Sequence, residues 1–411
     1  MPARRDDPDA AEQPATAAGR RSDGPGRRPD AAAEAQAAAD GRQQPGGAAR
    51  PPAVSIVMAA HDAAATIGAA IASCLAQTFT DFELLVIDDA SHDDTAGIAA
   101  SYDDPRVRLV RLPRNVGAGA ARNEGLRAAR GALVAILDAD DVSYPARLER
   151  QVAYLDAHAE CGLLGTAFDR IDAAGAVVGT AHIPTDDATL RWRLLTGNVI
   201  AHSSVVMRRD LALAAGGYPE GHRNGQDYAL WVALMATTRL AQLPDVLIGY
   251  RDNPHGLTAT RTGDHRRTIV ETSRAALSAA CGRSVSPEAA ACLWGIRPSA
   301  GARAACLEGA KALADALPVV AAAPGAPAGT AGALLADWRR QATRLCTIAP
   351  SAWPPIARLS LRLGGATGAG RLDPAYLSWC RGSLAAATRA AAVAGVRRLR
   401  RRSPATASAR T

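Results

Sequence analysis

Aromatic residues and lysine are scarce in this sequence. Phe, Trp and Tyr together make up 4% of its 411 residues, so the core must be built largely from Ala, Leu, Val and Ile. Lys311 is the single lysine among 47 basic residues, a bias that we attribute to GC-rich coding and not to function. Hydrophobic residues reach 48% and charged residues 21%, a balance that excludes a wholly disordered or fibrous protein. At roughly 150 residues per domain, the length allows two or three domains.

Long apolar runs, a secretory signal and paired cysteines are also missing. The longest apolar runs, such as Leu317–Ala323, fall far short of the ~20 residues of a membrane span. The start, MPARRDDPDA, has no apolar stretch behind its arginines and does not predict a signal peptide. The seven cysteines include no CxxC pair, which argues against a disulfide framework and a structural zinc site. We therefore expect a reduced, cytoplasmic protein.

Charge is divided unevenly along the chain. Residues 1–50 hold 8 basic and 8 acidic residues, residues 51–259 hold 17 and 25, and residues 260–411 hold 22 and 7. The net charges are therefore 0, −8 and +15. A nucleic-acid-binding protein would carry its basic surface on its main folded domain, so we expect no nucleic-acid partner. Acidic clefts suit metal ions instead.

Composition predicts three regions. Residues 1–50 contain no Ile, Leu, Val, Phe, Trp or Tyr, and such a segment cannot offset its conformational entropy, so it should be a disordered tail. Residues 51–259 should form the main domain. Residues 260–411 are rich in Ala and Arg and should form a separate helical module, interrupted by a linker at Pro318–Gly329 and ending in a basic tail.

Strand-like and helix-like segments alternate from residue 54 to residue 137. Apolar runs predict strands at 54–58, 83–87, 107–111 and 133–137, and helix-like segments lie between them at 64–77, 93–102 and 118–130. This alternation predicts an α/β fold with a mostly parallel sheet flanked by helices. Further on, the pattern loosens, and we expect a strand at His202–Met207 and a helix at Gln226–Thr237.

In such a sheet, ligands bind beyond the carboxyl ends of the strands. That rule selects Ala59–Asp62, Asp88–Ser91 and Asp138–Asp141, which are polar or acidic. The carboxylates at 138, 140 and 141 would raise one another's pKa unless a cation joins them, and hard oxygen ligands suit Mg²⁺ or Mn²⁺. The alternative is that these carboxylates, like those at 88 and 89, only cap turns and helices. Asp227, in the first turn of a helix, has the same structural alternative.

Several other segments follow one another in a fixed order. They are Arg114–Gly117 with Ala121–Asn123, Tyr144–Leu148, Gly216–Tyr218, Gln226–Trp231, Leu243–Pro244 and Tyr250–Arg251. With the three strand ends, this series resembles the family-2 glycosyltransferases of the GT-A fold. The resemblance covers about half the chain, residues 54–252, and rests on several motifs in the right order.

The resemblance implies a role for each matching residue. Asp138 and Asp140 correspond to the family's DxD motif, with Asp140 as the direct ligand of Mn²⁺ or Mg²⁺ and Asp138 nearer the ribose. Asp227 corresponds to the catalytic base. The donor nucleotide would be bound by Asp89 at its base and by residues that line the pocket: Ala59, His61, Asp62, Arg122 and Asn123. The family often has Pro, Tyr and Asn at 59, 61 and 62, and Glu-Asp where this chain has Gln226-Asp227.

These residues imply a non-processive inverting glycosyltransferase. It would move one sugar from a nucleoside-diphosphate sugar to a glycan, lipid-linked or small-molecule acceptor, as in the synthesis of cell-envelope polysaccharides. Arg191-Trp192 lacks the context of the QxxRW signature of processive synthases, because position 189 is Thr. The alternative function is a catalytically silent module that binds nucleotide sugars or serves assembly, which could dispense with Asp227.

Two features stay open. His202 is either a satisfied, partly buried histidine or a residue near the acceptor side. The arginine-rich run at 396–402 is either a solvated helix end or a peripheral contact with anionic lipid at the inner face of the membrane.

Overall fold

The computed structural model describes residues 50–222, 224–252, 263–366, 379–382, 385 and 388. Residues 51–411 form one unit by their contacts, and residues 1–50 are grouped apart from it. Three sequence predictions therefore lie outside the described residues: the tail at 1–49, the domain boundary near 259 and the basic run at 396–402. No helix in the described part of the chain is long and apolar enough to cross a membrane.

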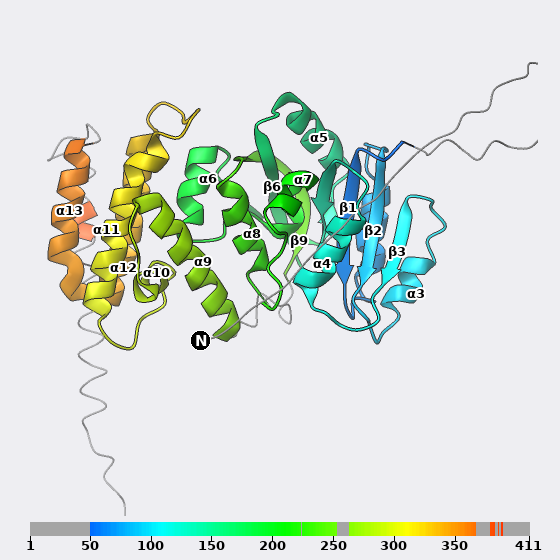
Figure 1. The fold of residues 1–411 in the computed structure, drawn as a ribbon, viewed down its shortest axis with the longest axis horizontal. Coiled ribbons are helices and arrows are strands. Elements are labelled where there is room, and N and C mark those ends of the chain that lie inside the picture. The colour runs from blue at the N-terminus through cyan, green and yellow to red at the C-terminus, as the bar shows by residue number, and fades with distance from the viewer. Residues whose placement is uncertain are drawn as a thin grey trace, which may run out of the picture. The chain divides into compact units, whose positions relative to one another are not determined.

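A nine-stranded sheet runs through the unit in the order β3-β2-β1-β4-β8-β6-β9-β5, with β7 paired to β6 (Figure 1). Its first half is wholly parallel and is formed by β1 (Val54–Ala60), β2 (Phe82–Asp88), β3 (Val107–Arg111) and β4 (Leu133–Ile136). Its second half is mixed and is formed by β5 (Val142–Ser143), β6 (Cys161–Ile171), β7 (Val177–Ala181), β8 (Val206–Arg208) and β9 (Arg239–Arg251). The predicted α/β fold with helices around a mostly parallel sheet is confirmed.

Alternation along the strands sends side chains to two cores, because successive residues of a strand face opposite sides of the sheet. Met58 packs in one core and Val57 in the other. A Cβ added to Gly125 would lie 2.3 Å from a methyl group of Val57, so this glycine lets α4 lie close to β1. The helices around the sheet are α2 (Ile67–Leu75), α3 (Thr95–Ala100), α4 (Ala118–Ala128), α5 (Arg147–Ala157), α6 (Asp187–Leu194), α7 (Arg209–Ala214) and α8 (Gln226–Met235).

The described stretch from 263 to 366 is mostly helical, as predicted. It contains α9 (Gly263–Cys281), α10 (Pro287–Leu293), α11 (Ala302–Ala321), α12 (Thr330–Ile348) and α13 (Trp353–Ala366). Their core also includes Trp192 of α6, whose indole N–H donates to Asp337 of α12 at 2.8 Å. The helices thus share a buried core with α6, while their folding as a separate module stays a prediction.

Two predicted segments are wrong in detail. His202–Met207 is not one strand: His202–Ser204 form a 3₁₀ turn, closed by the bond from Ser204 N to Ala201 O, and β8 begins at Val206. The linker expected to begin at Pro318 starts later, because α11 continues to Ala321 with Leu317 and Val320 buried in its last turns. All seven cysteines are free, in agreement with the absence of a disulfide framework.

Candidate active site

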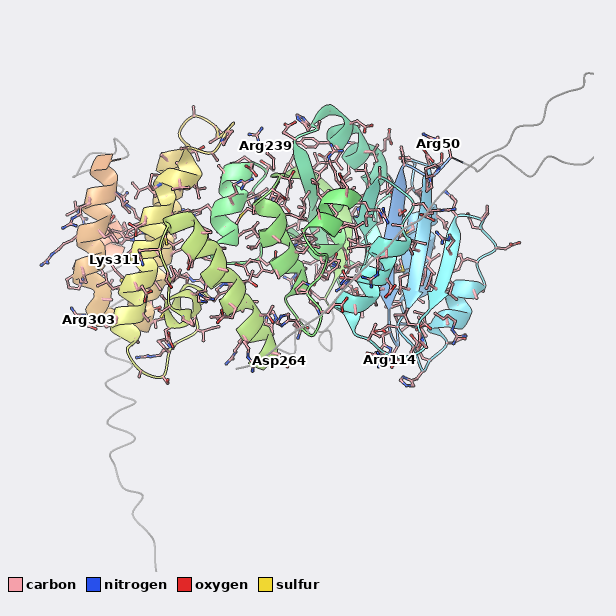
Figure 2. The ribbon with its side chains drawn as sticks, in the orientation of Figure 1. Arg50, Arg114, Arg239, Asp264, Arg303 and Lys311 are labelled. Carbon is pink, nitrogen blue, oxygen red and sulfur yellow. The ribbon has the colours of Figure 1, made fainter. Side chains whose placement is uncertain are left out.

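The loops that follow β1, β2 and β4 lie at one edge of the sheet. Ala60, the last residue of β1, pairs with Asp88, the last residue of β2, and Leu137 N donates to Val57 O just beyond β4. Arg114, which follows β3, marks this carboxyl-end edge at the lower side of the view in Figure 2. The three polar segments predicted from the sequence therefore meet at the same edge.

Asp138 is held by two side chains at this edge. Its Oδ1 accepts a hydrogen bond from Arg122 at 2.7 Å, and its Oδ2 lies 3.0 Å from Nδ1 of His202. Burial alone would raise the pKa of Asp138, but His202 and Arg122 together hold it well below its usual value. Asp138 is therefore ionised and oriented by two side chains that come from α4 and from the turn before β8.

Arg122 connects Asp138 to two other groups. Its guanidinium lies 5.7 Å from the ring centre of Tyr218, and its buried Nε has no hydrogen-bond partner among the described residues. Burial lowers the pKa of Arg122, but the pKa is raised overall by Asp138, Tyr218 and Asp227. Arg122 thus links Asp138 to Tyr218, and its contact with a nucleotide donor stays a prediction.

His202 is buried against the same group. Its Nε2 lies 3.0 Å from the Tyr218 hydroxyl, and its ring stacks over Trp231 at a centroid separation of 6.1 Å. Both ring nitrogens thus have partners, which agrees with the interpretation of a satisfied, partly buried histidine. Through its contact with Asp138, His202 also belongs to the site.

The rest of the acidic segment is held by β9. Arg251 donates its backbone N–H to Asp141 at 2.7 Å and its Nε to the backbone carbonyl of Asp140 at 2.7 Å. The other carboxylate oxygen of Asp141 accepts from the Ser203 hydroxyl. Burial, and then the charges of Asp138 and Asp140, raise the pKa of Asp141 well above its usual value. Three carboxylates are therefore crowded in one turn.

Asp227 is the second residue of α8. The helix begins after Gly225, whose φ of +79° suits glycine, and it is anchored by the buried side chains of Leu230, Trp231 and Leu234, as the sequence spacing predicted. The Asp227 carboxylate is half-buried and accepts a hydrogen bond from Asn198 at 2.7 Å. Its charge also raises the pKa of Tyr218, in addition to the larger effect of burial. Asp227 therefore lies within electrostatic reach of the Arg122–Asp138 group.

Asp89 holds a loop in the structure. Its two carboxylate oxygens accept the backbone N–H groups of Val116 at 2.7 Å and Gly117 at 2.9 Å, and its side chain is buried. This fixes the loop that leads from β3 into α4. The contact of Asp89 with a nucleotide base stays a prediction.

Asn123 makes a reciprocal pair with the Gly216–Tyr218 turn. Its Nδ2 donates to Tyr218 O and its Oδ1 accepts from Tyr218 N, both at 2.8 Å. Gly217 has a φ of +70°, and a Cβ there would lie 2.5 Å from Asn123 Oδ1. The structure thus gives Asn123 a positioning role, and its contact with the donor stays a prediction.

Ala59, His61 and Asp62 lie at the end of β1. Ala59 is half-buried, whereas His61 and Asp62 are exposed. His61 bonds to the carbonyl of Asp89 at 2.9 Å, which places these residues beside the Asp89 loop. They line the same edge as Asp138, as the sequence pattern predicted, although their contacts with a nucleotide stay predictions.

Some residues of the site had no distinct sequence signal. Asn198 lies in an exposed loop with no motif around it, and Ser203 was visible only as part of His202-Ser203-Ser204. In the sequence, Tyr218 stands out only as the last residue of the Gly216–Tyr218 segment. Arg251 appeared at the end of a strand motif, and its role in holding the 140–141 turn depends on a contact across 110 residues of sequence.

The carboxylates of the 138–141 turn suit a hard divalent cation. Asp138 is already paired with Arg122 and His202, and the charges of Asp138 and Asp140 add to the raised pKa of Asp141. Among the described residues, no three ligand atoms that include this turn lie within 4.8 Å of one another. Such a group of three is found at His61, Asp62 and His92. The turn could therefore offer a cation only one or two carboxylates, as Mg²⁺ sites commonly do with water and substrate oxygens, and metal binding here stays a prediction.

Comparison with known proteins points to one family of enzymes. The model of glycosyl transferase family 2 matches residues 55–213. The chain is 32% identical over 181 residues to the UDP-Glc:alpha-D-GlcNAc-diphosphoundecaprenol beta-1,3-glucosyltransferase WfgD of Escherichia coli, covering 44% of this chain and 69% of that protein. It is 29% identical over 205 residues to the amylovoran biosynthesis glycosyltransferase AmsE of Erwinia amylovora, covering 49% and 76%.

Two further similarities are more limited. The succinoglycan biosynthesis protein ExoO of Rhizobium meliloti is 50% identical over 95 residues, and the chain spans only 27% of its length. The crystal structure of S. aureus TarS 1-349 in complex with UDP-GlcNAc aligns at 16% identity with a TM-score of 0.49, covering 82% of this chain and 91% of that one.

The α/β fold with polar strand ends accommodates an enzyme that transfers glycosyl groups, and the family model and the named relatives show that this chain is such an enzyme. The family match and the relative that is covered over 69% of its length identify the family itself. This chain belongs to glycosyl transferase family 2.

Proposed function

We propose that this protein is a non-processive inverting glycosyltransferase that moves one sugar from a nucleoside-diphosphate sugar to an acceptor hydroxyl. The observation that carries the proposal is the meeting of Arg122, Asp138 and Asp227 at one sheet edge, although they come from α4, the loop after β4 and α8. This transfer needs three groups: a cationic hydrogen-bond donor, a carboxylate at a strand end and a second, half-buried carboxylate.

Donor binding follows from the charges of the edge. Asp138, Asp140 and Asp141 crowd one turn, where Arg122 pairs with Asp138, so the diphosphate of a donor would be repelled unless a divalent cation joined it. We assign Asp140 as the ligand of Mn²⁺ or Mg²⁺, with Asp138 close to the ribose. When bound, the cation supplies Lewis-acid stabilisation of the leaving diphosphate. The nucleotide would be lined by Asp89, Ala59, His61 and Asp62, with Arg122 and Asn123 bordering it.

Asp227 is proposed as the general base. An acceptor hydroxyl has a pKa far above neutrality and must lose its proton as it attacks the sugar. The bond from Asn198 orients one oxygen of the Asp227 carboxylate, and the half-buried position leaves it accessible to an acceptor. One displacement with one base inverts the configuration of the anomeric carbon.

The acceptor proposal comes from the relatives. Two of them are named for succinoglycan and amylovoran biosynthesis, and a third for glucosyl transfer to a diphosphoundecaprenol-linked GlcNAc. We propose a glycan or lipid-linked acceptor in polysaccharide synthesis, met in the cytoplasm at the inner face of the membrane. The basic run at 396–402, outside the described residues, would provide the lipid contact.

A donor screen tests the function. Purified protein with Mn²⁺ is incubated with a panel of nucleotide sugars, and thermal shift and donor hydrolysis are measured. We expect stabilisation and slow hydrolysis with one or a few donors, both abolished by EDTA and by Asp140→Asn. Asp172→Asn, in a surface turn where Asn can accept the same backbone bonds, is the matched control and should behave as wild type.

The outcomes separate the alternatives. Donor binding without hydrolysis or transfer to any acceptor would support the catalytically silent module. Equal transfer in excess EDTA would contradict the metal role. No response to any nucleotide sugar would contradict the proposed function.

A further inference from the structure

Three ligand-type side chains meet in the loops after β1 and β2, and none of them belongs to the 138–141 turn. Nε2 of His61 lies 3.5 Å from Oδ2 of Asp62, and Nδ1 of His92 lies 3.6 Å from the same oxygen. All three atoms lie within 4.8 Å of one another, and no other group of three His, Cys, Asp or Glu residues in the described part of the chain does so.

A hydrogen bond fixes how His61 presents its ring. Nδ1 of His61 lies 2.9 Å from the backbone carbonyl of Asp89, which can only accept, so Nδ1 must carry the proton and donate. In the neutral ring, Nε2 then has a lone pair that faces Asp62. Histidines that bind metals commonly donate their other ring N–H to a backbone carbonyl, which orients the ligand nitrogen and raises its basicity.

The carboxylate between the two rings is held ready as a ligand. Oδ1 of Asp62 accepts the backbone N–H of His92 at 2.7 Å, which leaves Oδ2 facing both imidazoles. This bond is the main reason why the pKa of Asp62 is lowered, so the carboxylate stays ionised. Two ring nitrogens and one ionised oxygen thus face one point.

The loops that carry these groups are fixed in an unusual conformation. Asp62 has a φ of +49° and Ala90 a φ of +55°, and the described residues include no other non-glycine residue with a positive φ. Bonds from Asp62 N to Ser91 and from Ala63 N to Thr95 hold the first loop against the second. Backbone strain of this kind clusters at functional sites.

We propose that His61, Asp62 and His92 form a binding site for a divalent transition metal of the zinc class. Ligand atoms bonded tetrahedrally at about 2.0–2.1 Å lie about 3.3–3.4 Å apart, close to the two measured separations. The third separation closes by rotation of the His92 ring, whose side chain is 84% exposed. Imidazole ligands favour Zn²⁺ over Mg²⁺ and Mn²⁺, so this site differs in chemistry from the carboxylate turn. The metal would clamp the loop after β1 to the loop after β2 and keep one coordination position open to solvent.

The test is a Zn²⁺ titration of the full chain against a chromogenic chelator, with millimolar Mg²⁺ present to occupy sites made only of carboxylates. We compare wild type with His92→Ala, which keeps the backbone bond to Asp62 and removes only an exposed ring. We expect the Zn²⁺ affinity of this site to fall at least about tenfold, since even indirect partners of a metal cost 10- to 100-fold. Zn²⁺ should also raise the melting temperature of wild type but not of His92→Ala.

His158→Ala is the matched control. His158 is a half-buried histidine whose Nδ1 lies 3.4 Å from Glu160, a pair that has no third ligand among the described residues. Its Zn²⁺ affinity and melting shift should equal those of wild type. Equal Zn²⁺ binding by wild type and His92→Ala would overturn the proposal, and so would the absence of Zn²⁺ binding by wild type. Donor binding and transfer are not read out, so failure here leaves the proposed glycosyl transfer untouched.

Discussion

At the amino end of β2, Glu83 is buried and accepts hydrogen bonds from Ser55 at 2.7 Å, Arg108 at 2.6 Å and the backbone of Arg130 at 2.9 Å. At the carboxyl edge of the same sheet, Asp138, Asp140 and Asp141 are crowded in one turn, with Arg122 paired to Asp138 and Arg251 bonded to the backbone carbonyl of Asp140. Burial alone would raise the pKa of Glu83, yet its partners lower it, whereas the pKa of Asp141 is raised.

This difference separates structural carboxylates from those of the site. A buried carboxylate whose hydrogen-bond and ion-pair partners all lie in the protein stabilises the fold, because these partners offset the cost of removing the charge from water. Where carboxylates are crowded together, the repulsion between their charges is offset only when a ligand or a metal ion binds. The amino-end edge should therefore control stability, and the carboxyl-end edge should control binding and transfer.

The largest effect on stability is expected for Glu83→Ala. It leaves Ser55 and the backbone of Arg130 without their buried partner, so the free energy of unfolding should fall by about 3 kcal/mol, the low end for breaking a buried ion pair. The low end applies because Arg108 and Arg130 are partly exposed and keep solvent. Urea unfolding measures it. Glu149→Ala removes an exposed carboxylate that accepts from Thr78 and should change stability by less than ~0.5 kcal/mol. Similar losses of unfolding free energy in both variants would contradict a special structural role for the buried carboxylate of Glu83.

Asn123→Ala tests the contrast at the carboxyl edge itself. Because both amide atoms of Asn123 are bonded to Tyr218, it should behave as a structural group, with a loss of about 1–3 kcal/mol in the free energy of unfolding. Donor affinity should change by no more than a few-fold. Asn115→Ala, an exposed loop variant, is the control for stability. A large loss of donor affinity at unchanged stability would instead assign Asn123 a direct donor contact.

A smaller, pH-dependent effect is expected for Glu83→Gln. The lowered pKa of folded Glu83 means that its stabilising charge is fully present above the unfolded pKa of ~4.3 and is lost as the pH falls through the folded value. Wild type should exceed Glu83→Gln by about 1–2 kcal/mol at pH 7, since bonds to a charged group are stronger than neutral ones. Urea unfolding at pH 7, 5 and 3 should show the difference shrinking with acid. A difference that is constant across this range would contradict the charge assignment.

Much of the fold was predictable because short apolar segments of the sequence indicate which residues are buried. The four parallel strands and the helices between them follow from apolar runs, and the strand-end rule then selected the loops at 59–62, 88–91 and 138–141. The 3₁₀ turn at His202 was not predicted, because the buried apolar residues that follow it favour a strand. Pro318 suggested a linker, although burial of Leu317 and Val320 carries α11 past it.

The site was predictable in its carboxylates but not in their partners. Asp138, Asp140 and Asp227 stand in recognisable motifs, whereas the pairing of Asp138 with His202 spans 64 residues and that of Asn123 with Tyr218 spans 95. Such contacts depend on how the sheet brings distant loops together, which periodicity does not encode. The metal-type group at 61, 62 and 92 escaped for the same reason.

Asp227 tests the central claim most directly, because the account makes it a base and not a helix cap. The measurement compares nucleotide-sugar binding and sugar transfer in wild type, Asp227→Asn and Asp210→Asn. Asp210 is the matched control, since it is likewise the second residue of its helix, α7, and is exposed. Asn keeps the size of the side chain and its capping ability, so stability should hardly change.

For Asp227→Asn we predict near wild-type nucleotide binding with transfer reduced at least ~100-fold, the lower end of the cost of losing a general base. Asp210→Asn should bind and transfer as wild type does. Transfer by Asp227→Asn within a few-fold of wild type would remove Asp227 from the mechanism, and a joint loss of nucleotide binding and transfer would make it a structural cap.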